Sequence, residues 1–218
     1  MDKNAKLEAL REEIASDRSL PLYGSANLVF GEGDPDAAVM FIGEAPGFHE
    51  DRLGRPFVGQ AGKLLDKLIL GVGWRREDVY ITNIVKRRPP ENRAPAPEEI
   101  AAYKPFLDEQ IKIIKPKVIA PLGRFSMNVF LPDAKISRDH GKPEYCGGYL
   151  IIPLYHPAAA LRSTAVLKEL EEDFKRLSEI VKNPPPPADA EALARKPSDT
   201  GFFKKDSAAA GDFQDKLF

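Results

Sequence analysis

Residues 37–43 have the sequence AAVMFIG, a short apolar run that ends in glycine. Three further runs share its length, its β-favouring residues and its Gly, Pro or charged borders: 78–83 (DVYITN), 117–123 (KVIAPLG) and 149–155 (YLIIPLY). Helix-favouring segments lie between and after these runs, near 59–73, 97–115, 124–131 and 164–182. Nearly continuous apolar strands that alternate with helices are typical of a parallel sheet covered on both faces. The sequence therefore predicts an α/β fold, a three-layer α/β/α sandwich around a mostly parallel sheet of about four strands.

The two ends of the chain differ from this central pattern. Leu7, Leu10 and Ile14 recur at helical spacing, which predicts a short amphipathic helix over residues 3–15 within an N-terminal lead-in, 1–22. Four prolines at 184–187 open a polar stretch that cannot bury enough surface to fold alone. We therefore expect one folded domain over 1–182, a Pro-rich disordered linker over 183–212 and an apolar peptide, FQDKLF, at 213–218.

Composition limits the classes of function. Lys and Arg number 32 against 33 Asp and Glu, so any contact with nucleic acid must come from a local basic patch. A single cysteine, Cys146, excludes an internal disulfide framework, a multi-cysteine zinc site and a four-thiolate iron–sulfur cluster. No apolar run is long enough to span a membrane, and the N-terminus lacks the apolar core of a signal peptide. We expect a cytoplasmic protein.

Polar side chains follow the predicted strands where each strand ends. Glu44 follows the first strand, Asn83 ends the second, Gly123-Arg124 follow the third and His156 follows the fourth. Ligands bind at the carboxyl ends of strands in open α/β sheets, so these groups predict one site. Taken singly, each has a structural explanation: a surface or capping carboxylate for Glu44, an Asx turn for Asn83 and a helix cap for His156.

Two loops flank this predicted site. Phe57 lies in the glycine-rich segment 54–62, GRPFVGQAG, as either a core aromatic that plugs the loop or a stacking platform for a flat ring. Residues 86–93, KRRPPENR, place four cations directly after Asn83, either as a solvated loop or as a phosphate-binding segment.

These segments resemble the uracil-DNA glycosylase superfamily, most closely its family 4, the thermostable-type bacterial and archaeal enzymes. The resemblance runs from about Val29 to Val181 and is carried by motifs in the right order and spacing: VFGEG (29–33), GEAPG (43–47), GRPFVGQAG (54–62), YITNIVKRRPP (80–90), NRAP (92–95) and HPAAALR (156–162). It implies a monofunctional uracil-DNA glycosylase of base-excision repair, a monomer that flips uracil out of single- or double-stranded DNA and hydrolyses its N-glycosidic bond.

The resemblance also implies roles for residues. Phe57 would stack on uracil, Asn83 would read its Watson–Crick edge, and His156 would donate to O2 as the bond breaks. Glu44 would activate water or stabilise the oxocarbenium-like sugar, with Glu50 and Asp51 as alternative carboxylates. The remaining expected contacts fall into two groups: Gly43 and Ala45 with uracil, and Lys86, Arg87, Arg88, Arg124, Ala158, Leu161 and Arg162 with DNA.

One feature departs from the family. Family 4 proteins usually carry four cysteines that bind an iron–sulfur cluster. The matching positions here hold Ser16, Ser19, Arg87, and Ala102 or Tyr103. Hydroxyl and methyl groups cannot replace thiolates for such a cluster, so we expect a member that has no cofactor or metal.

The C-terminal peptide carries a second recognisable sequence pattern. Gln214, Leu217 and Phe218 form a Q-x-x-L-F pattern that resembles the peptide with which bacterial repair proteins bind the replication sliding clamp, although an apolar end that packs on its own domain fits the same residues. Such binding would associate the protein with the nucleoid.

The alternatives for the domain are a non-catalytic DNA-binding or clamp-associated module, a glycosylase for another deaminated base, and a nucleotide-processing enzyme. The last is disfavoured because no G-x-G-x-x-G or Walker-type loop follows the first strand.

Overall fold

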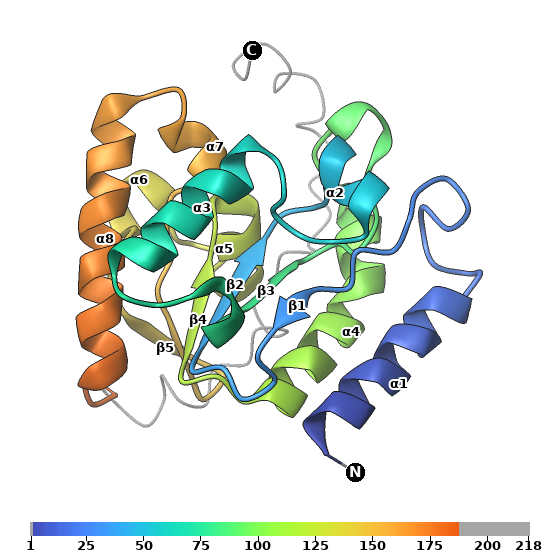
Figure 1. Ribbon diagram of the computed structural model, residues 1–218, viewed down its shortest axis with the longest axis horizontal. Helices are drawn as coiled ribbons and strands as arrows, with labels where there is room; N and C mark the ends of the chain where they lie inside the picture. The colour runs from blue at the N-terminus through green and yellow to red at the C-terminus, as the bar shows by residue number, and fades with distance from the viewer. Residues whose placement is uncertain (1, 188–218) are drawn as a thin grey trace.

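The computed structural model of the chain describes residues 2–187 and has one sheet with helices on both faces (Figure 1). The strand order is β1-β3-β2-β4-β6-β5. The four central strands are parallel and coincide with the four predicted runs: β3 (Tyr80–Asn83), β2 (Val39–Gly43), β4 (Val118–Pro121) and β6 (Tyr149–Ile151). The predicted three-layer α/β/α class is confirmed.

Two short antiparallel strands at the edges bring the sheet to six among the described residues. β1 (Glu32–Gly33) pairs with β3, and β5 (Glu144–Cys146) pairs with β6. The expectation of about four strands missed them because two or three residues are too few to show a period in the sequence.

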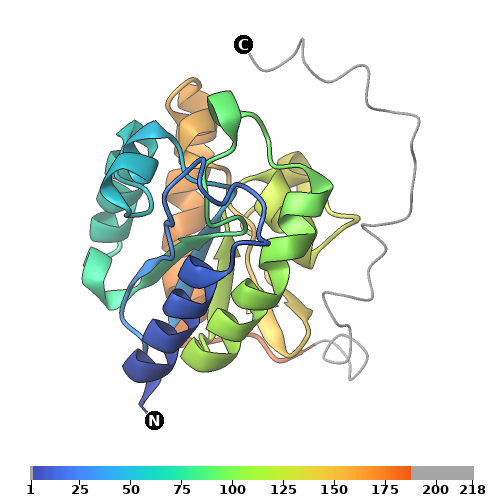
Figure 2. The ribbon, with the colours of Figure 1, turned by 90° about the vertical axis from the view of Figure 1, so that its right-hand side faces the viewer.

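The helices form one layer on each face of the sheet, because alternate strand residues point in opposite directions. Met40 and Ile42 pack with α1 (Lys3–Ser16), α4 (Pro97–Ile114) and α5 (Arg124–Phe130). Phe41, on the other face, packs with α3 (Gln60–Gly71) and α8 (Thr164–Lys182), and its ring stacks on Phe174 at 5.5 Å. Figure 2 shows the sheet between these layers. The remaining helices are short: α2 (Phe48–Leu53), α6 (Ile136–Asp139), α7 (Pro157–Ala160) and the 3-10 helices η1 (Arg76–Asp78) and η2 (Pro90–Asn92).

The N-terminal helix is present as predicted and buries Leu7, Leu10 and Ile14. At the other end, α8 finishes at Lys182, and the Tyr145 hydroxyl donates to the carbonyl of Pro185 at 2.9 Å. The rest of the predicted linker and the whole 213–218 peptide, with Gln214, Leu217 and Phe218, lie outside the described residues. Within residues 2–187, no helix has the length and apolar character needed to cross a membrane.

Candidate active site

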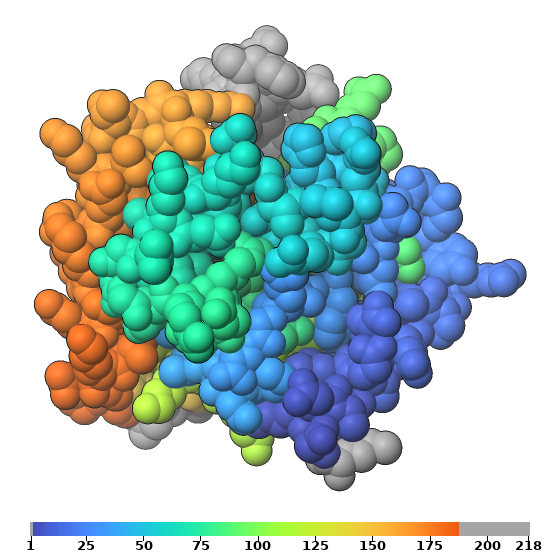
Figure 3. Space-filling model, in the orientation of Figure 1, coloured from blue at the N-terminus to red at the C-terminus, as the bar shows by residue number. Residues whose placement is uncertain are grey.

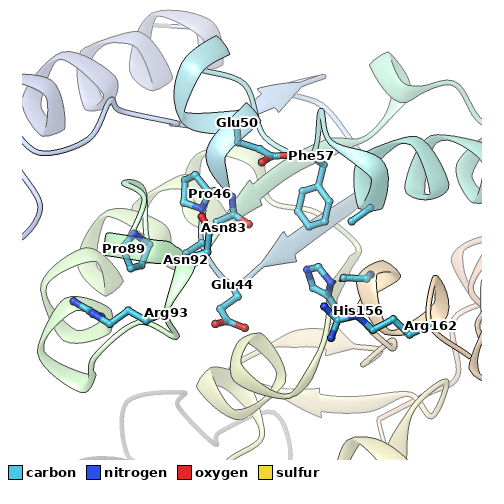
Figure 4. Close-up of a pocket in the computed structure, with 14 residues that line it drawn as sticks. Glu44, Pro46, Glu50, Phe57, Asn83, Pro89, Asn92, Arg93, His156 and Arg162 are labelled. Atoms are coloured by element: carbon cyan, nitrogen blue, oxygen red, sulfur yellow. Dashed lines mark hydrogen bonds between the residues drawn. The ribbon is translucent and has the colours of Figure 1, made fainter. Parts of the chain in front are cut away.

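A cavity of about 460 Å³ lies at the carboxyl edge of the parallel strands, where the sequence predicted a site. Glu44, Phe57, Asn83 and His156 all line it, although they come from four separate segments (Figure 4). Its other lining residues are Ala45, Pro46, Gly47, Glu50, Ala61, Pro89, Asn92, Arg93, Ala158 and Arg162. The carboxylate, the amide and the imidazole that were predicted to meet at this edge do so, and Phe57 lies with them. Gly123 and Arg124, which belong to the predicted set, are not among the residues that line the cavity.

Gly43 allows two of these side chains to meet. It ends β2 opposite Asn83 in the parallel register, and a Cβ on Gly43 would lie 2.6 Å from Phe57 Cε2 and Cζ and closer still to Asn83 Oδ1. Only a residue without a side chain fits there. Gly62 has the same part in α3, where a Cβ would collide with the Phe57 carbonyl. The amide and the ring thus rest directly on backbone.

The loop that carries Phe57 is fixed from both sides. Phe57 has φ 50°, a left-handed conformation that a bulky residue adopts only when its surroundings impose it. The Glu50 carboxylate accepts from the Val58 and Gly59 N–H groups, each at 2.9 Å. Arg76 donates to the carbonyls of Pro56, at 2.6 Å, and Phe57, at 3.3 Å. Phe57 is only 6% exposed yet lines the cavity, so it is both a core aromatic and a ring face for a ligand.

His156 caps α7 and faces the cavity at the same time. Its Nδ1 accepts from the Ala158 N–H at 3.1 Å. A neutral imidazole that accepts at Nδ1 carries its proton at Nε2, which makes Nε2–H the free donor. Burial lowers the pKa of His156 to about 4, with Glu50 acting in the opposite direction. At neutral pH the ring is therefore an uncharged donor.

Glu44 follows β2 and lines the same cavity as His156. Burial raises its pKa to about 7, while the positive charge of Arg124 acts to lower it. Arg124 begins α5 and lies at the same edge of the sheet as predicted. A carboxyl group that titrates near neutral pH is suited to proton transfer and to charge stabilisation.

The prediction that Lys86 contacts DNA is wrong, because the side chain lies inside the protein. The side chain is fully buried, and its ammonium donates to Thr82 Oγ1 at 2.7 Å, to the Asn83 carbonyl at 2.8 Å and to Gln110 Oε1. Thr82 and Gln110 in turn donate to the carbonyl of Phe30. Burial lowers the pKa of Lys86, and the three acceptors oppose that shift because they stabilise the charged form. Lys86 thus supports the end of β3 from behind Asn83.

The prediction that Arg87 contacts DNA is wrong for the same reason. It is 5% exposed and donates to the carbonyls of Ala26, at 3.0 Å, and Ile14, at 3.3 Å. Its guanidinium also lies 5.1 Å from the Tyr23 ring. Arg87 therefore ties the N-terminal segment to the loop after Asn83 instead of contacting phosphate.

The side chains at the positions compared above with the cluster cysteines of family 4 do not suit an iron–sulfur cluster. Ser16 and Ser19 donate to Glu12 and Asp17 oxygens, and the Tyr103 hydroxyl donates to the carbonyl of Pro21. Cys146, the one thiol of the chain, is buried in β5. Across residues 2–187, no three His, Cys, Asp or Glu side chains are grouped to hold a metal ion.

The other predicted DNA-contacting residues lie at or beside the cavity. Ala158 and Arg162 line it, and Leu161, at the end of α7, is 52% exposed. Arg88 borders Pro89, which lines the cavity. Six lining residues were not predicted from the sequence as site residues: Pro46, Gly47, Ala61, Pro89, Asn92 and Arg93. Arg93 belongs to the cationic segment 86–93, but nothing in the sequence indicates its 2.6 Å ion pair with Glu99.

The comparisons with known proteins agree with this geometry. The model of the uracil DNA glycosylase superfamily matches residues 30–179, which contain every residue lining the cavity. The chain belongs to the uracil DNA glycosylase superfamily.

Curated relatives in this superfamily cover most of the chain. It is 46% identical over 190 residues to a type-4 uracil-DNA glycosylase of Sulfurisphaera tokodaii, covering 82% of this chain and 86% of the relative. It is 43% identical over 182 residues to the type-4 enzyme of Thermotoga maritima, covering 81% and 95% of the two chains. For the type-4 enzyme of Archaeoglobus fulgidus, the identity is 45% over 184 residues, with 80% and 92% covered.

Proposed function

We propose that this protein is a monofunctional uracil-DNA glycosylase of base-excision repair that works without an iron–sulfur cluster. The observation that carries the proposal is the meeting of Glu44, Phe57, Asn83 and His156 in one cavity. Superfamily membership and the type-4 relatives support the same activity. We place its action on chromosomal DNA in the cytoplasm, as a monomer.

The cavity suits a pyrimidine flipped out of DNA. Uracil N3–H donates to the Asn83 amide oxygen, and the amide N–H donates to uracil O4, while the Phe57 ring stacks on the base. Cytosine has an acceptor at N3 and a donor at N4, so it would leave the buried amide unpaired on both sides. Gly43 and Ala45 provide the backbone against which the base lies.

Bond cleavage leaves negative charge on uracil, and His156 is placed to stabilise it. The neutral ring donates Nε2–H to O2 as the glycosidic bond stretches. One preorganised donor of this kind contributes about 3–4 kcal/mol to the transition state. No lysine amine lines the cavity within the described residues, which supports hydrolysis rather than a lyase reaction through an amine.

Glu44 in its ionised form stabilises the positive charge on the sugar and orients the attacking water. Glu50 is the weaker candidate for this part, since one of its oxygens already accepts from two backbone N–H groups. Asp51 is weaker too, because its Oδ1 accepts from the Asn27 N–H at 2.7 Å. Leu161 and Arg162 enter the space that the flipped base leaves, and Arg88 and Arg124 contact phosphates.

The test is alkaline strand cleavage of uracil-containing oligonucleotides, single-stranded and paired as U:G or U:A, with metal-free protein. We expect cleavage with the wild-type chain, and a rate lower by about two to three orders of magnitude for His156→Ala. Cleavage that is equal in both proteins would refute the role of His156. No cleavage of any uracil substrate would favour a non-catalytic binding module, and cleavage of hypoxanthine or xanthine substrates alone would favour another deaminated base.

We also propose that Gln214, Leu217 and Phe218 bind the replication sliding clamp. The support is the Q-x-x-L-F pattern itself, which follows the polar residues 183–212. Deletion of residues 214–218 should abolish capture of the clamp and leave activity on short oligonucleotides intact. Capture that survives the deletion would contradict the proposal.

A further inference from the structure

An exposed aromatic residue at the rim of the cavity has no part in the chemistry described above. Phe48 opens α2 directly after Gly47, which lines the cavity, and is 47% exposed. The guanidinium of Arg88 lies 5.2 Å from the centre of its ring, and that of Arg52 lies 5.7 Å away. We call Phe48, Arg52 and Arg88 the α2 platform.

The platform is attached to the cavity wall. Arg88 Nε donates to Asn92 Oδ1 at 2.7 Å, and Asn92 lines the cavity. Arg88 is also the neighbour of Pro89 in the chain, just as Phe48 is the neighbour of Gly47, and both neighbours line the cavity. The platform therefore borders the cavity, and Figures 1 and 3 show α2 at the surface of the molecule.

The charges of the platform are not neutralised within the protein. In the part of the chain that the structure describes, neither Arg52 nor Arg88 forms an ion pair with a carboxylate, although many of the other arginines do. The exposed part of the Phe48 ring offers a stacking surface to a base, and the two guanidinium groups beside it offer positive charge to a phosphate. Guanidinium planes and aromatic rings both stack on bases.

We propose that the α2 platform binds an unpaired nucleotide of the DNA strand next to the flipped uracil, whose base stacks on Phe48 and whose phosphates contact Arg52 and Arg88. The proposal rests on the proposed function and extends it, because it names the state of the neighbouring nucleotide. Arg162 and the exposed Leu161 lie on the α7 side of the same cavity, so the strand is held on both sides of the uracil. A base that remains paired in a duplex cannot stack on the platform, which favours single-stranded substrates.

The test measures the dissociation constant of fluorescent uracil oligonucleotides by anisotropy, so it gives a result even for a protein without glycosylase activity. Phe48→Ala should raise the dissociation constant for a single strand about tenfold or more, and Phe48→Trp should restore it. The effect on a U:A duplex should be clearly smaller. Leu70→Ala is the matched control, since Leu70 is 69% exposed on α3 and lines no part of the cavity; its dissociation constant should equal that of the wild type.

The contribution of Arg52 and Arg88 is tested by measuring how the dissociation constant depends on salt concentration. Arg52→Ala combined with Arg88→Ala should lower the slope of log Kd against log salt by about 1.4 for a single strand, since each lost phosphate contact contributes about 0.7. Single-strand affinity of Phe48→Ala within twofold of the wild type would overturn the proposal. Equal losses on single strands and duplexes would also overturn it, because they would indicate a contact that does not need an unpaired base.

Discussion

Gly43→Ala is the substitution whose effect can be worked out most directly from the structure. The added Cβ would lie 2.6 Å from two atoms of the Phe57 ring and closer to Asn83 Oδ1, whereas ordinary contact begins at 3.4 Å. The ring must therefore retreat by about 0.8 Å, and the amide by more. The ring cannot do so freely, because Arg76 and Glu50 fix the loop of Phe57 and Gly62 packs on the Phe57 carbonyl.

A displacement of about 1 Å in a group that positions a substrate costs about 10²-fold in rate. We therefore expect kcat/KM of Gly43→Ala for a uracil oligonucleotide to fall by about two orders of magnitude. Extended strand backbone accepts alanine, so the fold should survive with a loss of about 1–3 kcal/mol from overpacking. The assay is single-turnover cleavage, with circular dichroism to establish folding.

Gly71→Ala is the control, since a Cβ at that position of α3 meets no atom within 4 Å. It should retain wild-type activity. A folded Gly43→Ala protein whose kcat/KM stays within threefold of the wild type would refute the reasoning, because it would mean that Asn83 and Phe57 need not hold the positions described here.

Three further predictions concern charges and hydrogen bonds at the site. Asn83→Asp removes the N–H that uracil O4 accepts, so discrimination of uracil against cytosine should fall at least about tenfold in paired oligonucleotide assays; unchanged discrimination would show that Asn83 does not read the base. The kcat/KM of the wild type should rise with pH through about 7 as Glu44 ionises, and Glu44→Gln should remove this step from the profile. Lys86→Met leaves three buried acceptors unpaired and should lower the free energy of unfolding, measured in urea, by about 1–3 kcal/mol. The slope of log Kd for DNA against log salt should not change in this variant. A shallower slope would indicate that Lys86 contacts DNA after all.

The parallel core of the sheet and the place of the site follow from the sequence for one physical reason. A buried parallel strand needs a continuous apolar run, and polar residues at its carboxyl end have no packing function, so Glu44, Asn83 and His156 identify both the strand ends and the site. The position of Phe57 in the site can be predicted less directly from the sequence. Glycines at 54, 59 and 62 indicate close backbone approach, but the fixing of the loop depends on Arg76 and Glu50, whose contacts form only in the folded chain.

The orientation of Lys86 and Arg87 could not be predicted in the same way. A run of cations after a strand is usually solvated, and nothing local indicates burial. Their acceptors come from distant segments: the Gln110 side chain on α4 for Lys86, and the carbonyls of Ile14 and Ala26 for Arg87. Burial of a cation is possible only where such acceptors replace water, and sequence patterns do not register them.

Burial sets the charge of each group around the cavity, and the resulting set suits a neutral ligand that becomes an anion. His156 stays neutral and donates without bringing a positive charge that would have to be desolvated. Glu44 titrates near neutral pH, so in the proposed mechanism its negative charge is available for the sugar at moderate cost. The buried amino group of Lys86 donates to the carbonyl of Asn83 and thereby supports the end of β3 from within the protein. Such an arrangement gains more from uracil as it departs with negative charge than from uracil in the intact nucleotide, and that difference is what lowers a barrier.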